Sequence, residues 1–443
     1  MRIQLSDHFT YSKLIRFTLP SIAMMIFTSI YGVIDGFFVS NYVGATPFAA
    51  LNLIMPFLMV MSAIGFLFGS GGSALVAYTL GTGDRKGANG IFSLIVYLLI
   101  AIGLVLSIVG FAIVRPVALA FGATDAMVEY CVTYTRVCAF GLIPFMLQNA
   151  FQSFMIVAEK PKLGLYVTVA AGVSNMVLDW LFMGVFGLGI GSAAAASVIG
   201  MYVGGVLPLI YFSKKNSSLL KLGKAIKDYS SIAKAALNGS SEFMTNVSMS
   251  IVNMLYNFQL MKFAGENGVS AYGIIMYTNF IFVGVFFGYA VGVSPIIGYH
   301  YGTGVKKELK NVFSKSLKMI AIAATAMTVF AEVLAKPLAM IFASYDAKLL
   351  TITTRAIQIY SLSFLIMGFN IFGSALFTAL NDGVVSAAIS FFRTLLFQVA
   401  SVLILPLIFG LDGIWFSVLC AEMLALMITG LCIIKFRKKY EYI

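Results

Sequence analysis

Three polar side chains in apolar sequence are the residues best suited to do chemistry. Asp35 interrupts the apolar run from Ile22 to Tyr42, which is long enough to cross a bilayer. Asn175 and Asp179 lie four residues apart in another such run, so on a helix they share one face. An ionised Asp at the middle of a membrane helix costs about 2.5–3.5 kcal/mol on insertion scales, so it is paired, protonated or beside water. These residues predict a buried site for a proton or for Na⁺.

The predicted depths of these residues bring them to one level of the bilayer. At about 1.5 Å per residue, Asp179 lies about 24 Å into its span, and Asp35 lies late in the first span. Ser197 and Tyr134 lie about 10–12 Å into spans that enter from the opposite side. Two carboxylates in one low-dielectric site cannot easily both be ionised, which favours uptake of a cation. The plainer alternative is that Asp179 only braces Asn175 and that Asp35 lies near the headgroups.

The composition indicates an integral membrane protein. Of 443 residues, 60% are hydrophobic and only 10% are charged, whereas a soluble protein is about 25% charged. The apolar runs lack period-two alternation, so we expect helices rather than barrel strands. The first residues lack the features of a cleaved signal peptide. The four cysteines have no metal-ligand spacing, so no metal is expected beyond Na⁺ at Asp35, Asn175 and Asp179.

Twelve apolar spans predict an all-α membrane protein with two parallel, pseudo-symmetric lobes of six transmembrane helices each. The spans fall near 14–40, 51–79, 91–114, 127–157, 163–184, 189–213, 233–263, 270–300, 313–335, 349–379, 384–408 and 411–435. Residues 1–213 are expected to form the N-lobe with the cation-coupling site, residues 214–232 a cytoplasmic linker, and residues 233–443 the C-lobe.

The basic residues predict the orientation of the chain. A net charge of +12 would suit nucleic acid, but the charges lie in short loops, as in Arg85–Lys86 and Lys306–Lys307. Lys and Arg mark alternate connections, so by the positive-inside rule both termini are cytoplasmic. We expect a multi-pass protein of the cell membrane that is monomeric, contacts the lipid bilayer and binds no nucleic acid.

The two halves of the sequence are copies of each other. A gap-free shift of 221 positions places Gly44 on Gly265, the GTG at 81–83 on the GTG at 302–304, and Asn149 on Asn370. Such a constant offset indicates duplication. Six spans per copy make the copies parallel, with a cavity expected between them. Asp35 maps onto Tyr256, so the acidic site is expected in the first half alone.

The chain resembles the multidrug and toxic compound extrusion (MATE) family. The resemblance is carried by Pro20, by Asp35 in IDGFFVSNYVG, by Asn175 and Asp179, and by GSAAAAS ending at Ser197. The turn GTGDRKG and the motif NGSSEF at the start of the second half add to it. The resemblance covers the whole chain. It implies a twelve-span secondary antiporter, without a cofactor, that exports cationic or amphipathic small molecules in exchange for inward H⁺ or Na⁺.

The resemblance also implies roles for individual residues. Asp35, Asn175, Asp179 and Ser197 match the cation-coupling site, with Ser197 standing where Thr is commoner, and Tyr134 is added to this set.

The resemblance also implies where the first helix bends and which lobe binds the coupling cation. Pro20 matches a proline at which the first helix bends when the site changes its protonation. Some members of the family bind the coupling cation at acids in the seventh and tenth spans, in the C-lobe. In this chain, Tyr256 and the segment 368–370 are near the corresponding positions. The nearest acid, Glu242, is offset along its span, so coupling is expected in the N-lobe.

Four residues are expected to line the central cavity and to meet a cationic substrate. They are Asn149, Glu242, Asn370 and Glu422. The alternative for Glu242 and Glu422 is that each is neutral and hydrogen-bonded to Ser or backbone groups.

Two other kinds of transporter share parts of this plan. A lipid-linked oligosaccharide flippase would line its cavity with Arg or Lys, whereas here Arg136 and Arg393 are exceptions expected near span ends. A major-facilitator exporter also has two parallel halves, but the combination of Asp35, Asn175 and Asp179 is not its mark. An enzyme is not expected, because the sequence has no nucleophile–base, metal or phosphate-loop signature.

Overall fold

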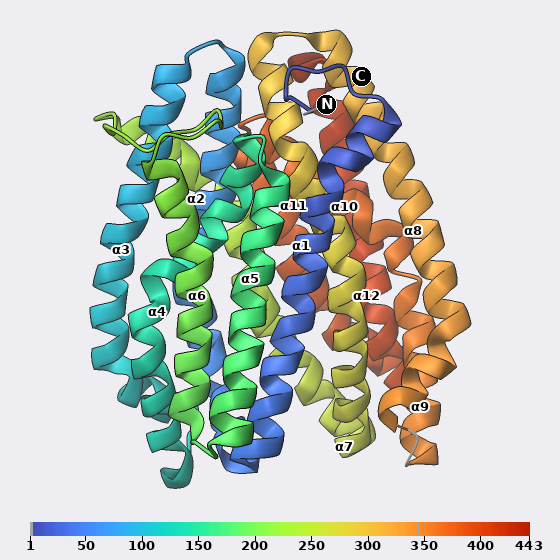
Figure 1. Cartoon of the computed structure of the whole chain (residues 1–443). Coiled ribbons are helices and arrows are strands. Elements are labelled where there is room, and N and C mark those ends of the chain that lie inside the picture. The colour runs from blue at the N-terminus through green and yellow to red at the C-terminus, as the bar shows by residue number, and fades with distance from the viewer. Residues whose placement is uncertain (1–2, 344–345) are drawn as a thin grey trace.

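The structure is a computed structural model that describes residues 3–343 and 346–443, and the regular structure in those ranges is helical, without strands (Figure 1). The helices are α1 (Tyr11–Phe38), α2 (Ala45–Gly81), α3 (Arg85–Ala120), α4 (Asp125–Val157), α5 (Pro161–Asp179), α6 (Ile190–Ser213), α7 (Tyr229–Thr303), α8 (Lys306–Ala343), α9 (Ala347–Ser361), α10 (Phe364–Ala379), α11 (Gly383–Phe391) and α12 (Phe397–Tyr440). Three π-helical segments join them, η1 (Val39–Val43), η2 (Trp180–Val185) and η3 (Phe392–Leu396).

These helices make the twelve predicted crossings. Within the described residues, nine helices are long and apolar enough to span a membrane, and the bent pair α9–α10 makes a tenth. Two of these are double crossings, because α7, with 75 residues, and the stretch Gly383–Tyr440, with 58, each contain a non-helical glycine. Gly265 and Gly410 sit at these breaks with φ of 61° and 59°. Only glycine adopts such a φ without strain, so each divides one long helix into two antiparallel spans.

The internal repeat of the sequence is also a repeat of backbone conformation. Gly44 and Gly265, which the 221-residue shift superimposes, both have positive φ, at 116° and 61°. Gly83 and Gly304, the last residues of the two GTG turns, also have positive φ, at 87° and 71°. The turns therefore recur in both halves because the same glycines permit them.

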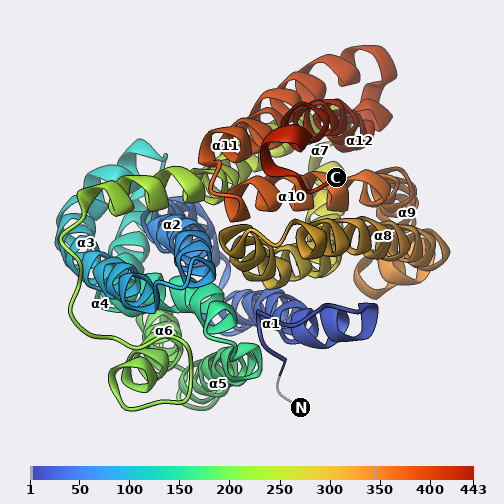
Figure 2. The same cartoon turned by 90° about the horizontal axis from the view of Figure 1, so that it is seen from above.

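The helices form two lobes, α1–α6 and α7–α12, which lie side by side when the molecule is seen from above (Figure 2). The buried apolar side chains divide in the same way, with one cluster in the second lobe and two in the first. Leu5, Phe9, Leu14 and Phe17 are an exception, because they precede or begin α1 yet pack into the cluster of the second lobe. The start of the chain therefore bridges the two lobes.

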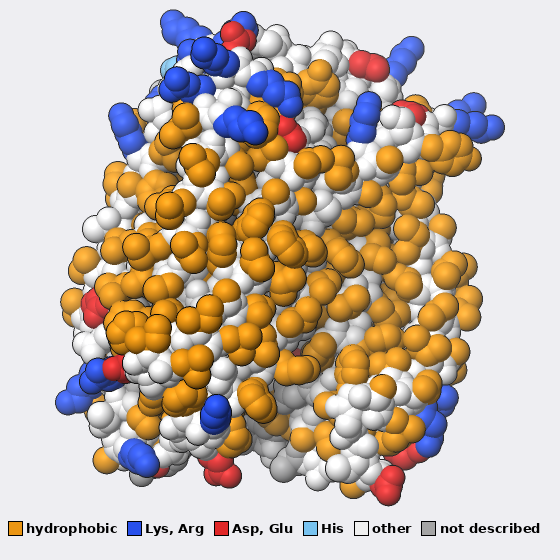
Figure 3. All heavy atoms as spheres, turned by 180° about the vertical axis from the view of Figure 1, so that it is seen from behind, with side chains coloured by type: hydrophobic (Ala, Val, Ile, Leu, Met, Phe, Trp, Pro, Cys, Tyr) orange, Lys and Arg blue, Asp and Glu red, His pale blue; other side chains and the backbone are white. Residues whose placement is uncertain are grey.

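Both chain ends lie on one face of the molecule, which also carries the α2–α3 and α7–α8 turns; we call it the terminal face (Figure 1). Lys and Arg gather at this end, and a broad apolar belt covers the middle of the molecule (Figure 3). The segment between α6 and α7 lies along α3, where the amide of Lys221 donates to Asn89 Oδ1 at 2.6 Å. The amide of Gly223 donates to Ser93 Oγ at 3.0 Å in the same contact.

Candidate functional site

Asp35, Asn175, Asp179 and Ser197 come together inside the first lobe. Asp35 lies near the end of α1, Asn175 and Asp179 share the last turn of α5, and Ser197 lies on α6. The Ser197 hydroxyl donates to Asp35 Oδ1 at 3.4 Å and accepts from Asn175 Nδ2 at 3.4 Å. The carboxyl groups of Asp35 and Asp179 are direct neighbours. The predicted spacing and depth thus do bring the four side chains to one place.

Small residues let the three helices approach closely enough to make this cluster. A Cβ on Gly200 of α6 would lie 3.0 Å from the carbonyl oxygen of Ala171 and 3.2 Å from Asn175 Cβ, both on α5. A Cβ on Gly172 of α5 would lie 2.5 Å from the ring of Phe27 on α1. In lipid, such small residues are what allow helix backbones to pack tightly.

The cluster contains buried oxygen atoms without partners. Asp179 is fully buried. Within the described part of the chain, neither of its carboxylate oxygens has a hydrogen-bond partner, and neither does Asn175 Oδ1. Unpaired buried acceptors are costly, and a buried charge is more so. These three acceptor oxygens lie beside the Asp35 carboxylate. A proton or Na⁺ bound among them would supply the missing partner. The chemistry available here is reversible cation uptake.

Two tyrosines flank the acids. Tyr134 on α4 is buried, and its hydroxyl lies near Ser197 and Asp35, as its predicted depth requires. Tyr31 also lies near Asp35 and next to Gln148, and sequence reasoning misses it. Tyr31 lies four residues before Asp35, so the two share one face of α1. This spacing could have predicted that Tyr31 is near the site.

Each of the three π-helical segments adjoins a polar residue of interest. The segment η1 begins shortly after Asp35, η2 begins directly after Asp179, and η3 contains Arg393. Single π-helical turns are frequent at functional sites, because the extra residue turns side chains to a new direction.

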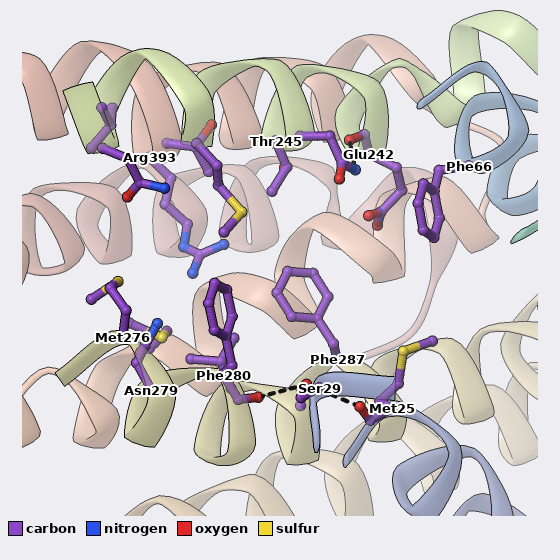
Figure 4. A pocket seen from close by; sticks show the side chains of 18 of the residues that line it. Met25, Ser29, Phe66, Glu242, Thr245, Met276, Asn279, Phe280, Phe287 and Arg393 are labelled. Carbon is purple, nitrogen blue, oxygen red and sulfur yellow. Dashed lines mark hydrogen bonds between the residues drawn. The ribbon is translucent and has the colours of Figure 1, made fainter. Parts of the chain in front are cut away.

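A central cavity of about 310 Å³ lies between the lobes, mostly against the second one. Its wall includes acids, one Arg, amides and hydroxyls, and apolar Met, Phe, Tyr and Val side chains. They include Met25, Ser29, Phe66, Asn149, Gln152, Glu242, Asn246, Tyr256, Met276, Asn279, Phe280, Phe287, Arg393, Gln398 and Glu422 (Figure 4). Soft sulfur and aromatic surfaces adapt to ligands of different shapes.

The predicted cavity residues have different positions. Asn149 and Glu242 line the cavity. Glu422 lines it too, with its carboxylate paired to Arg393, whereas Asn370 is not among the residues of the wall. Asn370 Nδ2 donates to Glu422 Oε2 at 2.7 Å and is itself fully buried. The Asn370 amide and one Glu422 oxygen therefore satisfy each other within the protein.

Arg393 is the residue that sequence reasoning places wrongly. The sequence predicts it near a span end, but it lies within the span that η3 interrupts and it lines the cavity. Its Nε donates to both oxygens of Glu422, at 2.9 and 3.0 Å. A lone Arg in an apolar span signals a buried partner, because an unpaired charge there is too costly. Arg136, in contrast, is exposed on α4 and lies over the Phe111 ring.

Pro20 lies inside α1, and the helix continues through it. Proline has no amide hydrogen and removes one backbone hydrogen bond of the preceding turn. In a membrane helix, this leaves a place where the helix bends at small cost.

The fold and the buried cluster define the class of this molecule: an α-helical membrane protein with two parallel six-span lobes around a central cavity. Secondary transporters are built in this way. The MatE family model matches residues 20–181 and again residues 243–404. The chain belongs to the MatE family. The two matched segments begin at Pro20 and Phe243, one in each lobe, as the duplication requires. The major-facilitator alternative is therefore set aside.

Curated relatives and solved structures agree with this assignment. The chain is 23% identical over 419 residues to "Multidrug export protein MepA" of Staphylococcus haemolyticus (strain JCSC1435), covering 93% of this chain and 90% of that protein. It is 22% identical over 444 residues to the protein of the same name from Staphylococcus saprophyticus, covering 97% and 94%.

Two solved structures share the whole fold. A MATE in complex with MaL6 is similar with a TM-score of 0.92 and 21% identity, over 97% of this chain and 98% of that chain. The outward-facing conformation of a multidrug resistance MATE family transporter of the MOP superfamily gives a TM-score of 0.91 and 22% identity, over 97% and 98%.

Proposed function

We propose that this chain is a secondary antiporter that exports cationic or amphipathic small molecules in exchange for inward H⁺ or Na⁺, with the cation taken up by Asp35 and Asp179. Relatives that carry the name multidrug export protein support the export of small molecules. The adaptable Met- and Phe-rich cavity supports a range of ligand shapes.

The observation that carries the proposal is a difference between the two lobes. Glu422, a buried acid of the second lobe, is neutralised by Arg393 of the same chain. Within the described residues, no Lys, Arg or His pairs with Asp35 or Asp179, and Asp179 has two unpaired oxygens. The pair Asp35 and Asp179 therefore needs a mobile cation, whereas Glu422 already has a resident one. This supports coupling at Asp35, Asn175, Asp179 and Ser197, with Tyr134 beside them.

In the proposed cycle, the terminal face is cytoplasmic, as its Lys and Arg favour. A cation from the opposite side binds between the carboxyl groups of Asp35 and Asp179, and α1 bends at Pro20. Because α1 also lines the cavity through Met25 and Ser29, its bending displaces the substrate outward. The lobes then rock to open inward.

The membrane potential can drive this exchange. Each positive charge that moves inward is worth about 2.3 kcal/mol per 100 mV. A tenfold concentration ratio costs about 1.4 kcal/mol. At 100 mV, an exchange that moves one net positive charge inward therefore supports a substrate ratio of about fortyfold.

The test is the exchange Asp35→Asn, measured as dye efflux from proteoliposomes with H⁺ or Na⁺ gradients imposed separately. We expect gradient-driven efflux to fall to background while dye binding to the purified protein remains. Asp125→Asn, at an exposed acid in the first turn of α4, is the matched control. Unimpaired efflux by the Asp35 variant would exclude the proposal.

One observation favours a second candidate function. Arg393 is an interior cation of the kind that a lipid-linked oligosaccharide flippase would use for pyrophosphate, although Glu422 neutralises it. Translocation of a fluorescent lipid-linked saccharide by the reconstituted protein, without an ion gradient, would support the flippase over the antiporter.

A further inference from the structure

The central cavity presents two opposite charges on one side. Glu242 extends from α7 and Arg393 from η3, and both side chains reach toward the wall formed by Phe280 and Phe287 (Figure 4). The two groups are close enough to interact electrostatically. In the described part of the chain, no hydrogen bond joins the Glu242 carboxylate to another residue. That carboxylate is thus open to a cationic group in the cavity.

The guanidinium of Arg393 has donors left over. Its Nε makes the hydrogen bonds to Glu422, at 2.9 and 3.0 Å, and Asn370 Nδ2 donates to Glu422 at 2.7 Å. The Glu422 carboxylate is therefore well satisfied. The remaining donors of Arg393, on Nη1 and Nη2, have no hydrogen-bond partner among the described residues, and the residue is only 8% exposed. Unpaired donors in so buried a group favour an acceptor from a ligand.

Carboxylate is the acceptor that these donors fit best. A guanidinium binds a planar carboxylate through two parallel hydrogen bonds along one edge. Glu422 already holds the Nε side, which leaves the Nη1–Nη2 edge for one such group. A phosphate dianion is less suited, because Glu242 and Glu422 place negative charge on the same wall.

We propose that the cavity binds zwitterionic amphipathic molecules, with the carboxylate of the ligand on Arg393 and its cationic group at Glu242. The apolar body of the ligand lies between them against Met276, Phe280 and Phe287. This rests on the proposed export function, which it narrows to a substrate class with two charges.

The test uses two dyes that differ in one group. Tetramethylrhodamine has a free carboxylate and is a zwitterion at neutral pH, whereas its methyl ester is a cation of nearly the same size. Binding of each to the purified full-length protein in nanodiscs is measured by fluorescence anisotropy. Because Arg393→Gln alone leaves Glu422 without its partner, the test variant is Arg393→Gln/Glu422→Gln.

We expect this double variant to bind the zwitterion about tenfold more weakly or worse, since a hydrogen bond to a charged group is worth about 1.5–3 kcal/mol. Its affinity for the ester should change by less than about threefold by the same reasoning. Glu242→Gln should weaken both dyes. The matched control is Arg355→Gln/Asp412→Asn, which removes an ion pair of the same lobe outside the cavity wall.

An unchanged ratio of the two affinities in the test variant would overturn the proposal, and so would an equal loss for both dyes. Transport separates this result from the proposed function. If the ester is exported in an Asp35-dependent way but Arg393 does not affect the ratio, the antiporter stands and the zwitterion site falls. If the zwitterion needs Arg393 to bind but neither dye is driven by a gradient, the site stands and the antiporter falls.

Discussion

Gly81 and Gly302 lie against each other where the two lobes meet at the terminal face. A Cβ on Gly81 would lie 3.0 Å from Gly302 Cα and 2.2 Å from the carbonyl oxygen of Tyr299. A Cβ on Gly302 would lie 2.2 Å from the carbonyl oxygen of Tyr78. Both are the first glycine of a GTG turn, so the symmetry of the duplication brings two copies of one residue into contact. Their lack of side chains lets the lobes close on this side.

Gly81→Val should open the terminal face. The added side chain cannot fit against the backbone of α7, so the lobes must separate there, and the equilibrium shifts toward a state open on this side. The measurement is the distance between spin labels at Lys86 and Lys307, two exposed residues of the facing turns, in a variant without native cysteines. We expect a longer distance in the Val variant.

The control for this experiment is Gly273→Ala, because a Cβ there meets nothing within 4 Å. The labels in this control should keep the distance of the parent protein. An unchanged distance in Gly81→Val, in a protein that still folds, would show that the contact does not hold the lobes together.

Ser197 should be needed through its hydroxyl alone. Its hydroxyl bonds both Asp35 and Asn175. Ser197→Ala removes both bonds, each worth about 0.5–1.5 kcal/mol, so the affinity for the coupling cation should fall about tenfold. Ser197→Thr keeps the hydroxyl and should retain most of the affinity. The measurement is the initial rate of dye efflux as a function of the imposed H⁺ or Na⁺ concentration, and equal rates for Ala and Thr would contradict the role.

Much of the fold could be predicted from the sequence because lipid leaves the backbone few choices. A long apolar run must be a helix, since its backbone groups find no water. The repeat then fixed the parallel lobes, and Gly44 and Gly265 marked equivalent turns that the structure bears out in their positive φ. The bend of 48° between α9 and α10 could not be predicted in this way, because no repeated glycine marks it in the sequence.

The candidate site could be predicted in part. Helical spacing placed Asn175 and Asp179 on one face, and counting along the spans gave the level that they share with Asp35. The same counting put Arg393 near a span end, whereas it lies within its span at η3, and depth does not tell in which direction a side chain points. Its partner Glu422 lies 29 residues away on another helix, so only tertiary packing brings the two together.

The start of the chain should stabilise the closed arrangement of the lobes. The Leu5 amide donates to Glu159 Oε1 of the first lobe at 2.8 Å, and the Phe9 amide donates to Glu308 Oε1 of the second at 2.8 Å. The Glu308 carboxylate also bonds His8 at 2.6 Å and Asn311 at 2.8 Å. Hydrogen bonds to a charged group are worth about 1.5–3 kcal/mol each, so Glu308→Gln should lower the melting temperature of the purified protein.

Glu129→Gln is the matched control for Glu308, since Glu129 is exposed and its one ion-pair partner among the described residues is the exposed Arg115. Such surface pairs contribute about 0–1 kcal/mol, so the melting temperature should hardly change. Equal melting temperatures for the two variants would mean that the start of the chain does not fasten the lobes.

The Arg393–Glu422 pair should behave as a buried ion pair in a double-mutant cycle. Removing Arg393 alone leaves an uncompensated carboxylate in a residue that is 1% exposed, and breaking such a pair costs about 3–5 kcal/mol. Removing both charges, as Arg393→Gln/Glu422→Gln, should restore much of the stability, because neither partner is then a buried lone charge. Thermal unfolding of the two single variants and the double variant gives the coupling energy. Losses that simply add would mean that the two side chains do not depend on each other, and the assignment of Arg393 as the resident cation of the second lobe would fail.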